Sequence, residues 1–254
     1  MDKRIGAQFY TLREQCKTIE DFRETCRKVS EMGYKIIQVS GTPLEAADMK
    51  PIIDEFGFQV VVTHKGYDDF VNRIEYIIEY NKILGCDICG IGSMPDEYKH
   101  SADKLSEFIA GINKAAERLA QEGLYLGYHN HAFEFSRLEG EFIMDRLIKE
   151  TNPGNVKFIV DTYWLQMGGQ NPAAFIKGLG ERAMAIHFKD VKPNLDNSVE
   201  MAEIGQGSLC WDEIIAACEE AGSKWALVEQ DICKRSPFES LKMSYDYLLA
   251  KGFC

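Results

Sequence analysis

Gly33-Tyr34-Lys35-Ile36-Ile37-Gln38-Val39 is the stretch that decides the fold, because it contains the junction that the rest of the chain repeats. A glycine that can adopt the left-handed conformation precedes a short apolar run typical of a buried strand. Upstream, Thr18 stands three residues before Asp21, and apolar residues follow at helical spacing up to Val29. The sequence therefore predicts a capped amphipathic helix that ends at Gly33 and leads directly into a strand.

The same junction of a glycine and an apolar run recurs along the chain. Apolar residues at helical spacing precede it, for example in 74–84 and in 105–119, where Ser101 is placed to cap the helix start. The further junctions are Gly57 before 58–62, Gly85 before 86–89, Gly123 before 124–126, Gly154 before 156–160, Gly180 before 183–188 and Gly222 before 225–228. With an apolar run at 5–9, these junctions predict eight strands that alternate with helices.

Strands that alternate with long helices pair in parallel through right-handed crossovers, and eight such units close a barrel. A chain of 254 residues that is 45% hydrophobic has the size of one such domain. The competing architecture is an open doubly wound sheet, but Gln8-Phe9-Tyr10-Thr11-Leu12 follows the first strand in place of a glycine-rich phosphate loop. We therefore expect an α/β protein with a single (β/α)8 TIM barrel domain over residues 1–254.

The composition excludes several classes of protein. A formal net charge of −11 opposes binding to nucleic acid and to anionic membranes, which both depend on clustered Lys and Arg. The longest apolar runs are far shorter than the ~20 residues of a membrane span, and residues 1–5 lack the apolar core of a signal peptide. We expect a cytoplasmic protein with no nucleic-acid partner and no membrane contact. The sequence leaves the oligomeric state open, a homo-oligomer included.

The eight cysteines are expected to be reduced thiols, because they fall at apolar strand and helix positions and a chain of this size needs no disulfides. Cys86 and Cys89 have CxxC spacing, but there is no second CxxC pair and both fall on an expected strand. We interpret them as buried apolar residues rather than as zinc or redox ligands.

Four of the five histidines lie at or just past the carboxyl end of an expected strand: His64, His129, His131 and His187. Only His100 lies elsewhere. Barrel enzymes build their active sites at this one face, from the ends of several strands. The clustering of histidines there is the strongest indication of function in the sequence.

Acidic residues end two further strands, since Asp161 follows Ile159-Val160 and Glu229 follows Leu227-Val228. With His187 between them along the chain, they predict a divalent metal site of mixed imidazole and carboxylate ligands, suited to Mn, Co, Zn or Fe. Each residue also has a simpler interpretation. Asp161 could cap the next helix, His187 could be a core histidine, and Glu229 could pair with Lys189.

On the fifth strand the two-residue period puts Tyr125, Gly127, His129 and His131 on one face, opposite Leu124, Leu126 and Tyr128. His129 is thereby placed as a fourth metal ligand. His131 could contact a substrate hydroxyl or fill a core position, and the sequence favours neither.

With the histidines and acidic residues at these positions, the sequence resembles the xylose isomerase-like barrel superfamily, in particular its sugar phosphate isomerase/epimerase group. The resemblance spans almost the whole chain. The motifs that carry it are Gln8-Phe9-Tyr10-Thr11, Thr63-His64, Tyr128-His129-Asn130-His131, Val160-Asp161-Thr162-Tyr163-Trp164, His187-Phe188-Lys189-Asp190, Gly205-Gln206-Gly207 and Val228-Glu229-Gln230-Asp231.

The resemblance implies a metal held by a Glu, an Asp, a His and a second Glu, with both Glu residues moving protons at the substrate carbon. Asp161, His187 and Glu229 match the last three, and His129 replaces the first Glu. Trp164 is a second departure, because many relatives have His there. Glu134, a few residues beyond His129, could return a carboxylate to the site.

The implied function is a metal-dependent sugar isomerase or epimerase that forms an enediolate from a ketose, keto-sugar or keto-inositol, with Mn the favoured metal. Glu229 is the expected base, and His129, His131 or Glu134 would return the proton. The implied substrate contacts are His64, His131, Lys189, Gln8 and Trp164. Loss of a β-hydroxyl from the same enediolate would make the protein a dehydratase instead.

Two other classes of function compete with this one. Apurinic endonucleases share the fold, but they need several zinc ions and a DNA-binding surface, and the acidic chain shows neither the ligands nor a basic stripe. The second competing class is a sugar-binding barrel without catalytic activity. It is plausible because the Glu that the family has on the fifth strand is replaced by His129.

Overall fold

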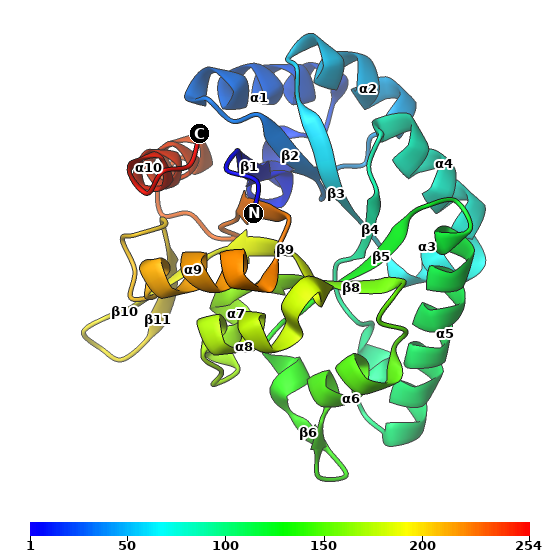
Figure 1. Cartoon of the computed structure of the whole chain (residues 1–254). Helices are drawn as coiled ribbons and strands as arrows, with labels where there is room; N and C mark the ends of the chain where they lie inside the picture. Colours follow the sequence, from blue (N-terminus) through cyan, green and yellow to red (C-terminus); the bar gives the residue numbers. More distant parts are fainter.

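The computed structural model describes all residues, 1–254, and its core is a closed barrel of eight parallel strands (Figure 1). Around the barrel the strand order is β1-β12-β9-β8-β5-β4-β3-β2. The strands are β1 (Ile5–Gln8), β2 (Ile36–Val39), β3 (Gln59–Lys65), β4 (Ile88–Ile91), β5 (Tyr125–His129), β8 (Val156–Asp161), β9 (Ala183–Phe188) and β12 (Trp225–Val228). All eight predicted strands are present, and the (β/α)8 TIM barrel prediction is confirmed.

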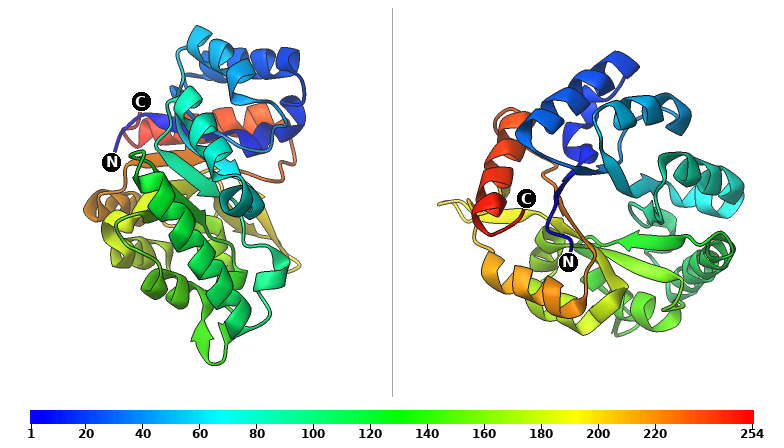
Figure 2. Two further views of the ribbon diagram at one scale, coloured as in Figure 1. Left: turned by 90° about the vertical axis from the view of Figure 1, so that its right-hand side faces the viewer. Right: turned by 45° about the horizontal axis from the view of Figure 1, so that its top comes forward.

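Ten helices surround the strands (Figure 2). They are α1 (Ile19–Met32), α2 (Ala46–Glu55), α3 (Tyr67–Asn72), α4 (Ile74–Leu84), α5 (Ala102–Ala120), α6 (Ile143–Glu150), α7 (Thr162–Met167), α8 (Pro172–Leu179), α9 (Trp211–Ala221) and α10 (Pro237–Ala250). None of them combines the length and the apolar composition that crossing a bilayer requires.

The predicted helix caps and apolar faces are confirmed. Thr18 accepts a hydrogen bond from the backbone N–H of Asp21 at 3.1 Å, and Ser101 accepts one from Lys104 at 3.2 Å. The apolar residues of α1 and α5 are buried in a core of 62 residues between the strands and the helices. A second cluster of 8 residues, Ile159 and Leu227 among them, fills the barrel itself, so that the barrel is a packed core and not a pore.

Six of the seven junction glycines have positive φ, as the predicted left-handed helix ends require. Gly154 is the exception, and the prediction is wrong there. Helix α6 ends before Thr151, whose backbone is extended, and Asn152 then forms a turn by accepting a hydrogen bond from the N–H of Gly154 at 2.9 Å. An Asn side chain supplies the turn, so the backbone needs no left-handed residue.

Two short antiparallel hairpins project from the barrel and were not predicted (Figure 1). One pairs β6 (Arg137–Leu138) with β7 (Glu141–Phe142), and the other pairs β10 (Asp190–Pro193) with β11 (Val199–Ala202). The chain ends meet beside β1, where Cys254 donates a hydrogen bond to Lys3 O at 2.7 Å. All eight cysteines are free thiols, as expected.

Candidate functional site

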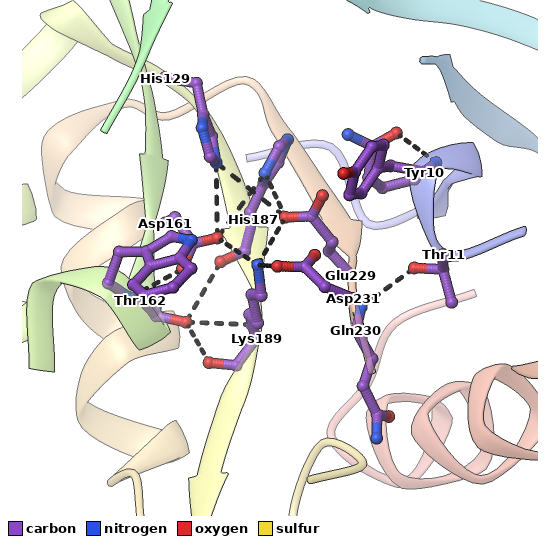
Figure 3. Close-up of polar contacts among 12 residues, drawn as sticks. Tyr10, Thr11, His129, Asp161, Thr162, His187, Lys189, Glu229, Gln230 and Asp231 are labelled. Atoms are coloured by element: carbon purple, nitrogen blue, oxygen red, sulfur yellow. Dashed lines mark hydrogen bonds and ion pairs between the residues drawn. The ribbon is translucent and has the colours of Figure 1, made fainter. Parts of the chain in front are cut away.

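Four side chains from four neighbouring strands converge at the carboxyl end of the barrel (Figure 3). His129 ends β5, Asp161 ends β8, His187 lies on β9 and Glu229 follows β12. All four are buried, and one ligand atom from each lies within 4.8 Å of every other. The predicted set of metal ligands is therefore assembled in one place by four strand ends.

Carbonyl groups orient the two imidazoles. His187 Nε2 lies 2.8 Å from Gln38 Oε1, and His129 Nδ1 lies 3.0 Å from Gly92 O. Because carbonyl oxygens only accept, these outer nitrogens carry the ring hydrogens, and the inner nitrogens keep a bare lone pair. Burial lowers the pKa of His129 to about 3, which keeps that ring neutral.

The inner atoms of the four side chains face one another. His187 Nδ1 lies 2.9 Å from Glu229 Oε2, and His129 Nε2 lies 3.4 Å from Asp161 Oδ2. Neither His129 Nε2 nor Asp161 Oδ2 has a hydrogen-bond partner, although both are buried. Buried acceptors that approach one another repel unless a positive charge lies between them. Two imidazoles and two carboxylates are a donor set that suits a divalent transition metal, so the residues fit such an ion.

Lys189 partly balances the negative charge of the cluster. Its Nζ lies 3.3 Å from Asp161 Oδ2, 3.4 Å from Glu229 Oε2 and 2.7 Å from Asp231 Oδ2. Burial alone would lower the pKa of Lys189, but the three carboxylates outweigh it and raise the pKa. In the same way Lys189 overcomes the effect of burial on Glu229 and holds the pKa of that carboxyl well below its usual range. Glu229 is therefore ionised, the form that a general base needs.

The simpler interpretations of two ligands hold at the same time as the metal site. Asp161 does cap helix α7, because its Oδ1 accepts a hydrogen bond from Trp164 N at 3.0 Å, while Oδ2 faces the cluster and lies 3.3 Å from Lys189 Nζ. Glu229 does lie beside Lys189. The cap fixes the Asp161 side chain, and in this way it orients the ligand as well.

A cavity of about 520 Å³ opens above the cluster, a size common for small-molecule sites. Its wall contains four of the five predicted substrate contacts, which are His64, His131, Lys189 and Trp164. The other lining residues are Tyr10, Ser40, Thr42, Lys65, Gly66, Gly92, Ser93, His129, Glu229 and Asp231. The cavity and the cluster together form one candidate site.

Gln8 does not line the cavity, so its predicted substrate contact has no geometric support. The side chain is fully buried on β1, and its Oε1 accepts a hydrogen bond from Tyr10 N at 3.0 Å. This bond caps a short 3-10 helix over Phe9–Gln15. Gln8 shapes the start of the loop that presents Tyr10 to the cavity.

Glu134 lies outside the site, so the expectation that it returns a carboxylate there is not supported. After β5 the chain enters a 3-10 helix, Phe133–Phe135, which carries Glu134 to the side where Tyr128 lies. Tyr128 donates a hydrogen bond to Oε1 at 2.7 Å, and His131 N donates one to Oε2 at 2.8 Å. Both oxygens are used in fixing the loop that carries His131.

Three residues that matter for the site were missed. Gln38 holds His187, Asp231 pairs with Lys189, and the Thr162 hydroxyl joins β8 to β9 by hydrogen bonds to His187 O at 3.1 Å and Lys189 O at 2.8 Å. The sequence did contain a signal for Gln38 and for Asp231. Gln38 is a polar residue inside an apolar strand, and Asp231 lies two residues past the predicted base.

Known proteins are similar to this chain in sequence or in fold. Inosose dehydratase of Lacticaseibacillus casei is 29% identical across 89% of this chain and 88% of its own length. The crystal structure of a sugar phosphate isomerase/epimerase from Parabacteroides distasonis has a TM-score of 0.82 at 24% identity, covering 98% of this chain and 94% of that one. That of the probable 3-DHS dehydratase from Bacillus anthracis has a TM-score of 0.77 at 15% identity, covering 97% and 98%. The two solved structures show the shared fold.

The family model described as the xylose isomerase-like TIM barrel matches residues 26–231, which includes seven of the eight barrel strands and all four residues of the cluster. The resemblance inferred from the sequence motifs is thereby confirmed. This chain belongs to the xylose isomerase-like TIM barrel family.

Proposed function

We propose that this chain is an enzyme that uses one divalent metal ion, with Mn favoured, to remove water from a polyhydroxylated ketone such as a keto-inositol or keto-sugar. His129, Asp161, His187 and Glu229 would hold the ion. When bound, the ion polarises the ketone oxygen and stabilises the negative charge that develops there. The protein's own residues must then remove a proton and assist the departure of a hydroxyl group.

The observation that carries this proposal is the state of His129. Its Nδ1 is engaged by Gly92 O, and its Nε2 faces Asp161 within the cluster. No nitrogen of this ring is left to carry a proton to or from a substrate. The family pattern with two proton-transferring Glu residues is therefore reduced here to one, Glu229. One carboxylate base with a neighbouring acid is what an elimination requires.

Glu229 takes the proton from the carbon next to the ketone, and hydroxide leaves from the following carbon. Lys189, an ammonium that lines the same cavity, supplies an N–H to the departing hydroxyl, so that water is released. The organic product is an enol that tautomerises to a 1,2-diketone. The similarity to an inosose dehydratase across most of both chains supports the same choice.

Isomerisation or epimerisation is the second candidate, and His131 is the observation that favours it. His131 lines the cavity, and its Nδ1 is buried without a hydrogen-bond partner. A histidine at that position could return a proton to carbon in place of the missing Glu. This reaction shares its first step with dehydration.

Incubation of the Mn-loaded protein with keto-inositols and ketoses in heavy water tests the proposal. Mass spectrometry should show loss of one water from the substrate and a product that absorbs in the near ultraviolet. Deuterium in a recovered ketone of unchanged composition would favour the isomerase. A protein that only binds sugars would show neither change.

A further inference from the structure

We infer that the substrate is uncharged, a polyhydroxy ketone with no phosphate or carboxylate group. This inference rests on the proposed function and names the substrate class of the same cavity. The charges around the cluster, the direction of the Lys65 ammonium group and the neutral groups on the rest of the cavity wall each support it.

The cluster is electrically balanced once a divalent ion is bound. Asp161, Glu229 and Asp231 bring three negative charges, and Lys189, which contacts all three, brings one positive charge. The two remaining negative charges equal the charge of one divalent ion. Because the imidazole ligands bind a metal as neutral groups, no positive charge is left over to attract an anionic substituent.

Lys65 is the only other cation among the residues that line the cavity, and its ammonium group is directed elsewhere. Its Nζ lies 3.8 Å from the centre of the Tyr80 ring and 3.3 Å from the hydroxyl of Tyr76, both on helix α4. The Tyr76 hydroxyl in turn lies 3.1 Å from Glu45 Oε2. The positive charge of Lys65 is thus stabilised by the face of the Tyr80 ring and by the Tyr76 hydroxyl, which is itself bonded to the Glu45 carboxylate. These groups lie on the side of β3 that faces helix α4.

Apart from the charged residues already named, the cavity wall carries neutral polar groups. Tyr10, Ser40, Thr42 and Ser93 contribute hydroxyls, and Gly66 and Gly92 contribute backbone. No arginine lines the cavity. Phosphates and carboxylates are recognised by Arg or Lys, whereas neutral hydroxyl groups are matched by hydroxyls and backbone groups that both donate and accept. The part of the substrate that meets these groups should therefore be a polyol.

Paired substrates test this inference with the Mn-loaded protein. A ketose or keto-inositol is compared with its phosphate ester by solvent deuterium exchange and water loss, and myo-inositol is compared with an inositol monophosphate by equilibrium binding. We expect the neutral member of each pair to be preferred by about tenfold or more. Equal or better binding and turnover of the esters would overturn the inference and leave the proposed function standing. If no ketone reacts, the proposed function fails, and the binding pair still decides the charge of the ligand.

A gain of function gives a second measurement. Ser93 is exposed and lines the cavity, so Ser93→Lys adds a cation there with little risk to folding, and Ser93→Met is a control of similar length without charge. The lysine variant should bind the monophosphate about tenfold more tightly than the methionine variant and should bind myo-inositol no better. If wild type already binds the monophosphate as tightly as the lysine variant does, the cavity is anion-selective and the inference is wrong.

Discussion

Gln38 is the residue that gives His187 its orientation. The amide is fully buried on β2, and its Oε1 contacts the ring nitrogen that faces away from the cluster. This contact fixes both the rotation of the ring and the tautomer, and a ligand held in the productive state binds a metal more tightly. Gln38 would therefore act on a metal bound at the cluster through His187 alone, because it does not line the cavity itself.

Gln38→Met should weaken Mn binding by roughly 10- to 100-fold, because Met has a similar shape but cannot accept the hydrogen bond. Gln38→Glu should retain the affinity, since a carboxylate still accepts from Nε2. Isothermal titration calorimetry with Mn measures the dissociation constant of each variant. Thr63→Val is the matched control, because it removes a buried 2.8 Å hydrogen bond that joins β3 to Asn81 on helix α4 and does not involve a residue of the cluster. Equal affinities of Gln38→Met and wild type would contradict the role assigned to Gln38.

Glu229→Gln should lower exchange of the substrate carbon-bound proton by roughly 10²- to 10⁴-fold, the usual effect of losing a general base. Glu134→Gln tests the competing assignment, and it should leave exchange largely intact because Glu134 bonds only to Tyr128 and His131 N. Circular dichroism checks that both variants are folded. Normal exchange in Glu229→Gln would remove Glu229 from the proposed reaction.

Glu134 should make folding stability depend on pH. Burial raises the pKa of this carboxyl from 4.5 to about 8 in the folded protein, so the folded state holds the proton more tightly than the unfolded chain. The stabilisation is complete below pH 4.5 and is lost as the pH rises to about 8. Urea unfolding of the metal-free protein at pH 5, 6.5 and 8 should show wild type losing stability relative to Glu134→Gln, by an amount on the order of a few kcal/mol. A constant difference between the two proteins would show that Glu134 does not titrate in this range.

At the scale of elements, Asp190 organises the loop between β11 and α9. Its buried carboxylate accepts hydrogen bonds from the backbone of Gly205, Gly207 and Leu209 and from the indole of Trp211 at 2.7 Å. The glycines allow the backbone to wrap closely around the carboxylate. The Gly205-Gln206-Gly207 motif thus holds the start of β10, directly after Lys189 and two residues past the end of β9, the strand that carries His187.

Gly207→Ala should destabilise the fold by about 1–3 kcal/mol, because the added methyl group would lie 2.2 Å from Asp190 Oδ1. Gly178→Ala is the control. It lies in helix α8 with no atom within 4 Å of the added carbon, and it should be neutral or stabilising by up to about 1 kcal/mol. Thermal unfolding distinguishes them by several degrees. Equal melting temperatures would mean that the loop shifts to make room.

The elements could be predicted from the sequence wherever one local signal determines them. Gly33 and Thr18 mark helix ends by backbone conformation and capping, and both act within a few residues. The hairpin β10–β11 depends instead on a turn at Asn197, whose φ of 66° is set by local hydrogen bonds that composition alone does not reveal. Likewise the two-residue period placed His129 correctly but could not place Glu134, because the strand ends before it and a 3-10 helix changes the direction of the chain.

At the scale of the whole molecule, the barrel explains why residues far apart in the sequence could be assigned to one site. Parallel strands all present their carboxyl ends at the same face, so His129, Asp161, His187 and Glu229 had to be neighbours if the barrel was right. The second set of contacts, such as Gln38 to His187 across the barrel, depends on register and rotamers. Those are fixed only in three dimensions, which is why the ligands were predicted and their supports were not.

Metal binding should stabilise the whole barrel, because the ion joins four strands whose ligands otherwise bring bare acceptors together. At a free Mn concentration of about 100 times Kd the expected gain is ~2.7 kcal/mol, which raises Tm by roughly 5–10 °C for a chain of this size. Asp161→Asn should lose most of this rise although Asn still caps α7, since an amide is a poor ligand for the ion. Asp87→Asn, an exposed substitution just before β4 at the other end of the barrel, should keep the full rise. The measurement is the difference in Tm between the protein with Mn and the protein with EDTA. If this difference is the same in wild type and in Asp161→Asn, the ion binds elsewhere.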